Sequence, residues 1–179
     1  FGCPKGTKSA ETTWGNVWKE MREVGSLIGA QDGADTAITK QHEYLRDVTT
    51  HKHGTGTSIV WFDSGDKTPF IGAGHGGPQL LMDAVGAENV FADVDGGWAD
   101  GSWEKIVASD PDVIVVADAR WSTAKDKIAY LKGDPVLKQM RAVKENKFVT
   151  VSFSQSTPGA ELIDGAKTLN DGLAEIAGK

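Results

Sequence analysis

The chain has 179 residues, 39% of them apolar, which is enough for one domain of ordinary size with a buried core. Its net charge of −6 and its interleaved charges argue against a nucleic-acid partner and disfavour an anionic membrane surface. The one cysteine, Cys3, cannot form an internal disulfide or a zinc site, which leaves a free thiol or a bond to a cysteine outside this chain. No apolar run approaches a membrane span, and the opening FGCPKG, without Met, suggests a fragment.

The first predicted elements are two helices. From Thr13, apolar residues recur at spacings of three and four as far as residue 28, which predicts an amphipathic helix. Gly33 is expected to stop it, because glycine is common just past a helix end. A second helix is expected from Ala34 to about Thr49. Its thin apolar stripe is typical of a helix that lies on a surface or bridges two bodies.

The remaining chain alternates between strands and helices. Apolar runs predict strands at 58–62, 111–117 and 147–153, with a weaker one near 89–92, and the segment 64–77 is expected to be a loop. Helices are expected at 78–87, at 102–109, in two pieces within 119–146 that split at 133–135, and at 158–179. This order predicts an α/β fold, a three-layer sandwich with a small, mostly parallel sheet flanked by helices. Ligands of such sheets bind beyond the carboxyl ends of the strands.

Motifs for catalysis are weak. GAGHGG, 72–77, fits the dinucleotide pattern G-x-G-x-x-G, but only Pro-Phe-Ile precedes it where a strand is needed, so a flexible loop is favoured. A nucleotide-binding α/β enzyme that uses this loop stays as the alternative. His51 and His53 lack a third metal ligand, and no nucleophile–base pair can be placed at one sheet edge. The sequence therefore favours a binding protein without a metal or cofactor over an enzyme.

Aromatic residues are more informative. Trp98 stands in a glycine-flanked loop, and Trp121 and Phe153 follow predicted strands. Together they predict an apolar wall at the ligand edge, of the kind that holds a large flat ligand. Trp14 and Trp18 lie four residues apart on one helix and are expected in a core or an interface. Asp63 and Asp118 follow two different strands, where they would either converge or cap local structure.

Several motifs then follow one another in an order that is informative when they are taken together. They are Gly86-Ala87-Glu88-Asn89-Val90-Phe91, the loop with Trp98, Ser102-Trp103-Glu104, the run 111–116, Met140-Arg141-Ala142-Val143-Lys144 and Pro158-Gly159. From about residue 34 to the end, the chain resembles the carboxyl-terminal lobe of substrate-binding proteins of ABC importers for ferric siderophores, vitamin B12 and haem. One departure is Gly159-Ala160, where many relatives carry an arginine, so this position offers no carboxylate clamp.

The resemblance implies two lobes joined by a long helix, with ligand held between them. Residues 1–33 would be a remnant of the first lobe or hinge, 34–57 the joining helix and turn, and 58–179 the carboxyl-terminal ligand-binding lobe. The amino-terminal lobe is missing. The protein would work at the periplasm or the outer face of the cell membrane, as a free protein or a lipoprotein. It would capture an iron–siderophore complex, cobalamin or haem and deliver it to the ABC permease without catalysis.

The resemblance also assigns roles to residues. Trp98 aligns with an aromatic residue that contacts ligand, and Glu104 aligns with a glutamate that docks on permease arginines. Past the strand ends, Trp121, Phe153 and Phe70 would add apolar contacts. Arg120 and Gln155 would orient polar groups, arginine being suited to an anionic siderophore. His75 is a candidate ligand for haem iron.

Overall fold

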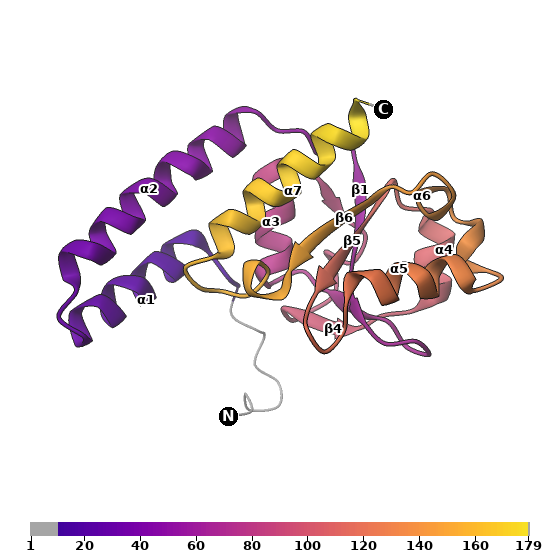
Figure 1. Ribbon diagram of the computed structural model, residues 1–179, viewed down its shortest axis with the longest axis horizontal. Helices are drawn as coiled ribbons and strands as arrows, with labels where there is room; N and C mark the ends of the chain where they lie inside the picture. The colour runs from indigo at the N-terminus through magenta and orange to yellow at the C-terminus, as the bar shows by residue number, and fades with distance from the viewer. Residues whose placement is uncertain (1–10, 179) are drawn as a thin grey trace.

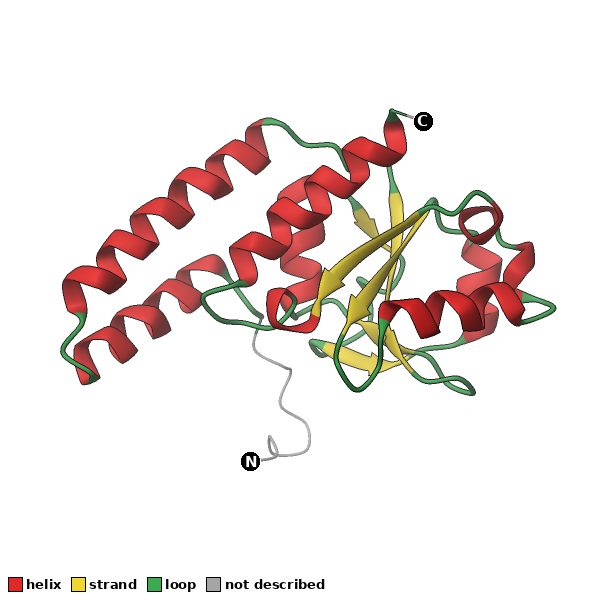
Figure 2. Cartoon of the chain, viewed as in Figure 1, coloured by secondary structure: helices red, strands yellow, loops and turns green. Residues whose placement is uncertain are grey.

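The structure, a computed structural model, describes residues 11–178, so the expectations for Cys3 and residues 1–10 lie outside the described residues. A central sheet carries helices on both faces, and a pair of long helices extends to one side (Figures 1 and 2). This arrangement confirms the predicted α/β fold class. No helix among the described residues is long and apolar enough to cross a membrane.

The sheet is built around three parallel strands. They are β1 (Ser58–Ser64), β5 (Val113–Asp118) and β6 (Phe148–Ser152), and the short β3 (Glu88–Asn89) runs parallel to the start of β1. All three long strands match predicted positions to within a few residues. β1 and β5 are nearly continuous runs of buried residues, as expected where helices cover both faces of a parallel sheet.

Two antiparallel strands extend the sheet beyond β1, where the sequence predicted loops. β2 (Phe70–Gly72) pairs with the end of β1, and β4 (Trp98–Asp100) pairs with β2, giving the order β4-β2-β1-β5-β6. Each has three residues, too few for an alternating pattern to show in the sequence. Their pairing is important for the site because it fixes Trp98 opposite Gly72, two residue pairs from Phe70.

The two faces of the sheet have separate cores. α3 (Gly77–Val85) and α7 (Leu162–Ala177) cover the face to which Trp61 and Val115 point. The other face, with Phe62 and Val116, is covered by α4 (Trp103–Ser109), α5 (Ala124–Gly133), η1 (Leu137–Gln139) and α6 (Arg141–Lys144). The predicted helix from 119 starts only at Ala124, because Ala119 and Ser122 pair in a tight turn.

The long helices α1 (Trp14–Leu27) and α2 (Gln31–Thr50) form an antiparallel hairpin that extends beyond α7 (Figure 1). The predicted helix stop at Gly33 is wrong, because Gly33 lies inside α2. The break falls at Gly29, whose φ of +71° is a conformation that glycine adopts without strain. The amide of Ala30 then donates to the Gly25 carbonyl, 2.7 Å away, and closes the turn.

Trp14 and Trp18 attach the hairpin to the body, as predicted for a core or interface. Trp14 packs against the core under α3 and α7, and its ring stacks on Trp18 with centroids 6.2 Å apart. The Trp18 indole Nε1 donates to Gln41 Oε1 at 2.9 Å. The Gln41 amide in turn donates to the Ala160 carbonyl just before α7, at 2.9 Å. One short chain of hydrogen bonds therefore joins α1, α2 and the start of α7.

Candidate ligand-binding site

Four side chains from four elements line a pocket of about 190 Å³ at the carboxyl edge of the sheet. They are Asp63 from the end of β1, Phe70 from β2, Trp98 from β4, and Phe153 from η2 (Phe153–Gln155) just after β6. We call this hollow the aromatic pocket. The structure thus brings together three predicted contact residues, Phe70, Trp98 and Phe153, on the side where the strands end.

Trp121 extends the aromatic pocket outward. Its ring meets Phe153 edge to face, with centroids 5.4 Å apart and planes at 71°. Trp121 is 76% exposed, so most of its indole surface is free in this structure. It stands in the tight turn after β5, beside the exposed Arg120. A large exposed aromatic at the rim of an apolar pocket is typical of a surface that a ligand covers.

The indole N–H of Trp98 has no hydrogen-bond acceptor. Its Nε1 is buried, although the residue as a whole is only half-buried. Trp61 also has an unpaired Nε1, but that residue lies wholly inside the core. A buried donor left without an acceptor costs roughly 1–3 kcal/mol. The Trp98 Nε1 is likewise closed to solvent, so it is the ring surface of Trp98 that the aromatic pocket offers.

The GAGHGG segment supports the Trp98 loop by close backbone packing. Ala73 N donates to Gly97 O at 3.0 Å, and His75 N donates to Gly96 O at 2.9 Å. A Cβ added at Gly74 would lie 2.1 Å from the Ala92 carbonyl oxygen. The glycines are therefore needed so that these two backbone segments of the chain can pack closely. Because β2 is antiparallel to β1, the segment also lacks the parallel strand of a dinucleotide site. This geometry offers no support for the nucleotide-binding alternative.

His75 and Gln155, both predicted ligand contacts, do not line the aromatic pocket. His75 Nδ1 lies 2.9 Å from Asp95 Oδ1, although its N–H does not point at that oxygen. The Gln155 side-chain oxygen accepts a hydrogen bond from the Ser152 amide at 3.4 Å and thereby caps η2. Their contacts with a ligand stay predictions. Among the described residues, no three His, Cys, Asp or Glu side chains gather as a metal site.

A buried lysine, which the sequence analysis missed, is hydrogen-bonded to the end of β5. Lys127 in α5 is 7% exposed, and its ammonium donates to the Ala117 carbonyl at the end of β5. Burial lowers the pKa of Lys127, and the nearby carboxylates of Asp63 and Asp118 partly offset that effect. No ion pair joins either aspartate to this ammonium among the described residues, and Asp118 caps α5 by accepting from Ala124 N at 2.7 Å. Lysine in a helix ordinarily indicates an exposed position, so no pattern marked it.

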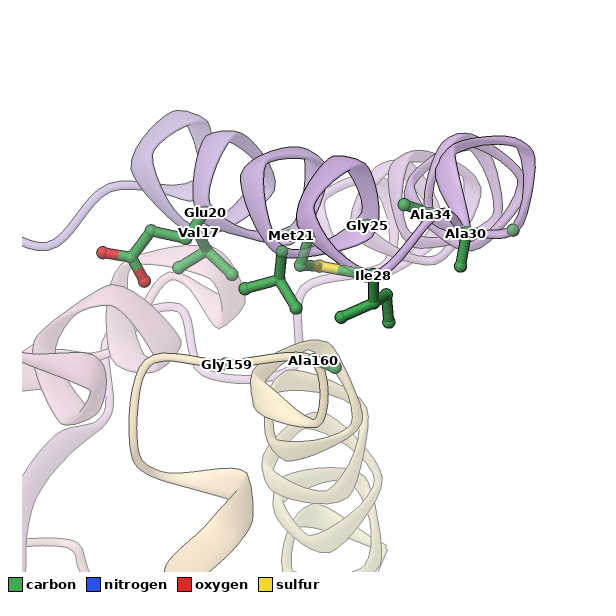
Figure 3. A pocket seen from close by; sticks show the side chains of 11 residues that line it. Val17, Glu20, Met21, Gly25, Ile28, Ala30, Ala34, Gly159 and Ala160 are labelled. Atoms are coloured by element: carbon green, nitrogen blue, oxygen red, sulfur yellow. The ribbon is translucent and has the colours of Figure 1, made fainter.

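A second open surface lies on the helical hairpin (Figure 3). α1, the start of α2 and the Gly159–Ala160 segment surround a hollow of about 420 Å³, which we call the hairpin hollow. Side chains from α1 and its end point toward that segment, namely Val17, Met21 and the capping Ile28. Three apolar side chains at the far end of α1 are largely exposed, namely Val24 (56%), Leu27 (85%) and Ile28 (71%). Such a cluster marks a surface that another body covers.

Glu104, the predicted docking residue, is exposed in the first turn of α4. The Ser102 hydroxyl donates to its Oε2 at 2.6 Å and lowers the pKa of the Glu104 carboxyl. The helix amino terminus also favours negative charge at this place. No lysine, arginine or histidine among the described residues forms an ion pair with Glu104. The site therefore presents a fixed, ionised carboxylate to solvent.

Comparison with known proteins places this geometry in context. A family model described as periplasmic binding protein matches residues 7–154. A periplasmic binding protein from Veillonella parvula is similar over 88% of this chain and 56% of its own, at 28% identity and a TM-score of 0.75. No match was found among curated protein sequences.

Two further solved structures share the fold. One is an ABC-type Fe³⁺-hydroxamate transport system protein from Saccharomonospora viridis, with 20% identity, a TM-score of 0.78, and 97% of this chain and 59% of its own covered. The other is a Staphylococcus aureus protein with bound ferrioxamine B, with 20% identity, a TM-score of 0.61, and 90% and 65% covered. The chain thus spans between 56% and 65% of the length of these three proteins.

Proposed function

The chain belongs to the periplasmic binding protein family, and from this premise we propose that it is the carboxyl-terminal lobe of an ABC importer's substrate-binding component. The complete protein works outside the cytoplasm, free or lipid-anchored. It captures a ferric siderophore between two lobes and delivers it to the permease; cobalamin and haem are the other cargoes of this kind. The function is closure of two lobes about a ligand, and no bond is made or broken.

The observation that carries the proposal is the aromatic pocket at the carboxyl edge of the sheet. Phe70, Trp98 and Phe153 offer ring surfaces to the apolar part of a large ligand. Trp121 widens the surface, and Arg120 beside it suits an anionic chelate. Hydroxamate transport and ferrioxamine B, named for two similar structures, favour a ferric siderophore.

The hairpin hollow supports the second part of the proposal, a covering amino-terminal lobe. α2 would join the two lobes, and the lobe before it would bury Val24, Leu27 and Ile28. Each such side chain contributes roughly 1.5–3 kcal/mol when fully buried. That gain is large enough to hold a lobe in place permanently. The similar proteins are longer than this chain, which is consistent with a further lobe in the complete protein.

Glu104 supports the third part, docking to the permease. It is an ionised, exposed carboxylate without a cationic partner among the described residues. An arginine of the permease would be a natural partner, because a guanidinium binds a carboxylate with two parallel hydrogen bonds.

Fluorescence titration tests the proposal. The complete two-lobed protein is titrated with ferric siderophores, cobalamin, haem and NAD, with haem absorption corrected. We expect saturable quenching of tryptophan emission by at least one ferric siderophore, and a much smaller change in the Trp98→Phe variant. Quenching by NAD alone would instead favour a nucleotide-binding enzyme. A protein that responds to none of these molecules would overturn the proposal.

A further inference from the structure

A third hollow lies on the opposite face of the sheet from α3 and α7. It is a groove of about 470 Å³ between α4 and the segment from α5 to η1, which we call the α4 groove. Its lining residues are Trp103, Glu104, Val107, Ala108, Tyr130, Asp134, Val136 and Leu137. The aromatic pocket and the hairpin hollow are lined by entirely different residues.

The wall of the α4 groove is apolar and rigid. The Trp103 indole and the Tyr130 hydroxyl both donate to the Asp66 carbonyl, each at 2.7 Å, so their polar atoms are already satisfied. Trp103 also packs edge to face on the buried Phe62, with centroids 5.1 Å apart. Val136 is 59% exposed between α5 and η1. The groove thus offers preformed carbon surface that nothing in this structure covers.

The charged groups in the α4 groove are both acidic. Asp134 Oδ1 accepts from the amides of Val136 and Leu137 at 2.8 and 2.9 Å, which fixes the carboxylate at the groove. Glu104 is held in place by Ser102. No ion pair to either carboxylate exists among residues 11–178. An occupant that fits must bring an apolar side chain together with a cationic one.

We propose that the α4 groove receives an extracytoplasmic segment of the permease in which an apolar side chain neighbours an arginine or lysine. This inference rests on the proposed function and enlarges the docking site from one glutamate to a groove. The apolar side chain lies between Val107 and Val136, and the cation lies between Glu104 and Asp134. The charges steer the encounter, and the buried apolar contact slows release.

The test compares two substitutions that add the same positive charge. Val136→Lys places an ammonium in the α4 groove, and Ala129→Lys places one at an exposed position of α5 outside it. The complete protein, with and without each change, is bound to its purified permease in lipid nanodiscs. We expect Val136→Lys to weaken the association at least tenfold, because it removes an apolar contact and repels the cation of the permease. Ala129→Lys should bind as the unchanged protein does, and siderophore affinity should be the same in all three proteins.

Glu104→Gln separates failure of this inference from failure of the proposed function. If Glu104→Gln weakens docking while Val136→Lys does not, the groove proposal is wrong and docking through the glutamate stands. Equal weakening by Val136→Lys and Ala129→Lys would also overturn the groove proposal. If the unchanged protein binds neither siderophore nor permease, the proposed function itself fails.

A photo-crosslinking amino acid at position 136 gives a second measurement that does not depend on affinity. In the complex with the permease it should attach to a permease subunit at a segment that contains an arginine or lysine. Attachment only to a second copy of this chain would overturn the proposal and assign the α4 groove to self-association.

Discussion

The aromatic pocket and the hairpin hollow are both apolar and both open, but they are built differently. The pocket takes aromatic side chains from two short strands and a 3-10 turn, with one carboxylate among them. The hollow takes mostly aliphatic side chains from two regular helices. Rings and polar atoms suit a ligand that must be recognised and released. Flexible aliphatic chains suit a permanent protein cover, which resembles the core of a domain.

The backbone beneath the two regions differs as well. The loop before Trp98 is packed so tightly on residues 72–77 that Gly74 and Gly76 have no room for a side chain. In the hairpin the packing varies: a Cβ on Gly25 would lie 2.6 Å from Ala34 Cβ, where the two helices meet, but nothing lies within 4 Å of a Cβ built on Gly33. A recognition site needs its side chains held in place, whereas a surface covered by another lobe gains its order from that contact.

Alanine substitutions at Gly74 and Gly33 should show the largest contrast. Gly74→Ala would bring a methyl group 2.1 Å from the Ala92 oxygen, and we expect overpacking to lower the free energy of unfolding by about 3 kcal/mol. Gly33→Ala should raise it by about 0.5–1 kcal/mol, because alanine favours the helix. Urea unfolding measures both. Similar values for the two variants would mean that the packing difference between the regions is not real.

Trp98→Ala tests the recognition half of the comparison. We expect siderophore affinity of the complete protein to fall about 100-fold, as for a central aromatic contact. Leu27→Ala, at an 85% exposed position of the hairpin, should leave that affinity unchanged. Isothermal calorimetry is the suitable measurement, since it does not use the indole as reporter. An equal loss in both variants would contradict the separation of roles.

Ile28→Asp tests the covering half. In the complete protein the change should lower the free energy of unfolding by about 2 kcal/mol, because a carboxylate would replace a buried aliphatic chain. Trp121→Asp is the matched control at the aromatic pocket, where the side chain is also largely exposed here. It should shift stability by less than about 0.5 kcal/mol. A hairpin that tolerates Ile28→Asp equally well is not covered by another lobe.

Asp112 lies just before β5, outside both regions. Its contribution to the free energy of unfolding is expected to be smaller and to depend on pH, so it serves as a reference. The Ser58 amide donates to its carboxylate at 2.9 Å and, with Arg141, lowers the pKa of Asp112 despite partial burial. The folded state therefore favours the ionised form. This stabilisation is complete above the unfolded pKa of about 3.9 and is lost as pH falls through the lower folded value.

Asp112→Asn should accordingly cost about 1 kcal/mol at pH 7, the size of one hydrogen bond to a partly exposed group. The difference from the unchanged protein should shrink toward pH 3. Urea unfolding between pH 3 and 7 measures it, with Glu175→Gln as an exposed control on α7. A difference that is constant with pH would show that ionisation of Asp112 does not matter for folding.

The sequence predicted the long elements well and the short ones poorly, for a physical reason. β1 and β5 are nearly continuous apolar runs, β6 alternates around Thr150, and Gly86 stands at the end of α3. β2 and β4 have three residues each and exist because they pair with each other, which no local pattern records. For the same reason the second helix was expected to start after Gly33, although contacts with α1 let it start at Gln31.

The candidate site was partly within reach of the sequence. Trp121 and Phe153 could be placed because parallel strands end at one edge of the sheet. Asp63 was noticed, but its place beside Phe70 and Trp98 depends on the two short strands. The α4 groove was out of reach, since Val107, Tyr130 and Val136 look like ordinary helix-face and loop residues until α4 and α5 are side by side.

The carbonyl oxygen of Asp66 has a mechanical consequence. Trp103 and Tyr130 hold this one oxygen from the α4 side, and the short connection that contains it leads directly into Phe70 at the sheet edge. Both donors use a backbone oxygen, so a substitution of the Asp66 side chain leaves the acceptor in place. The connection between β1 and β2 is thereby tied to α4 and α5 through a single atom, whatever side chain stands at position 66.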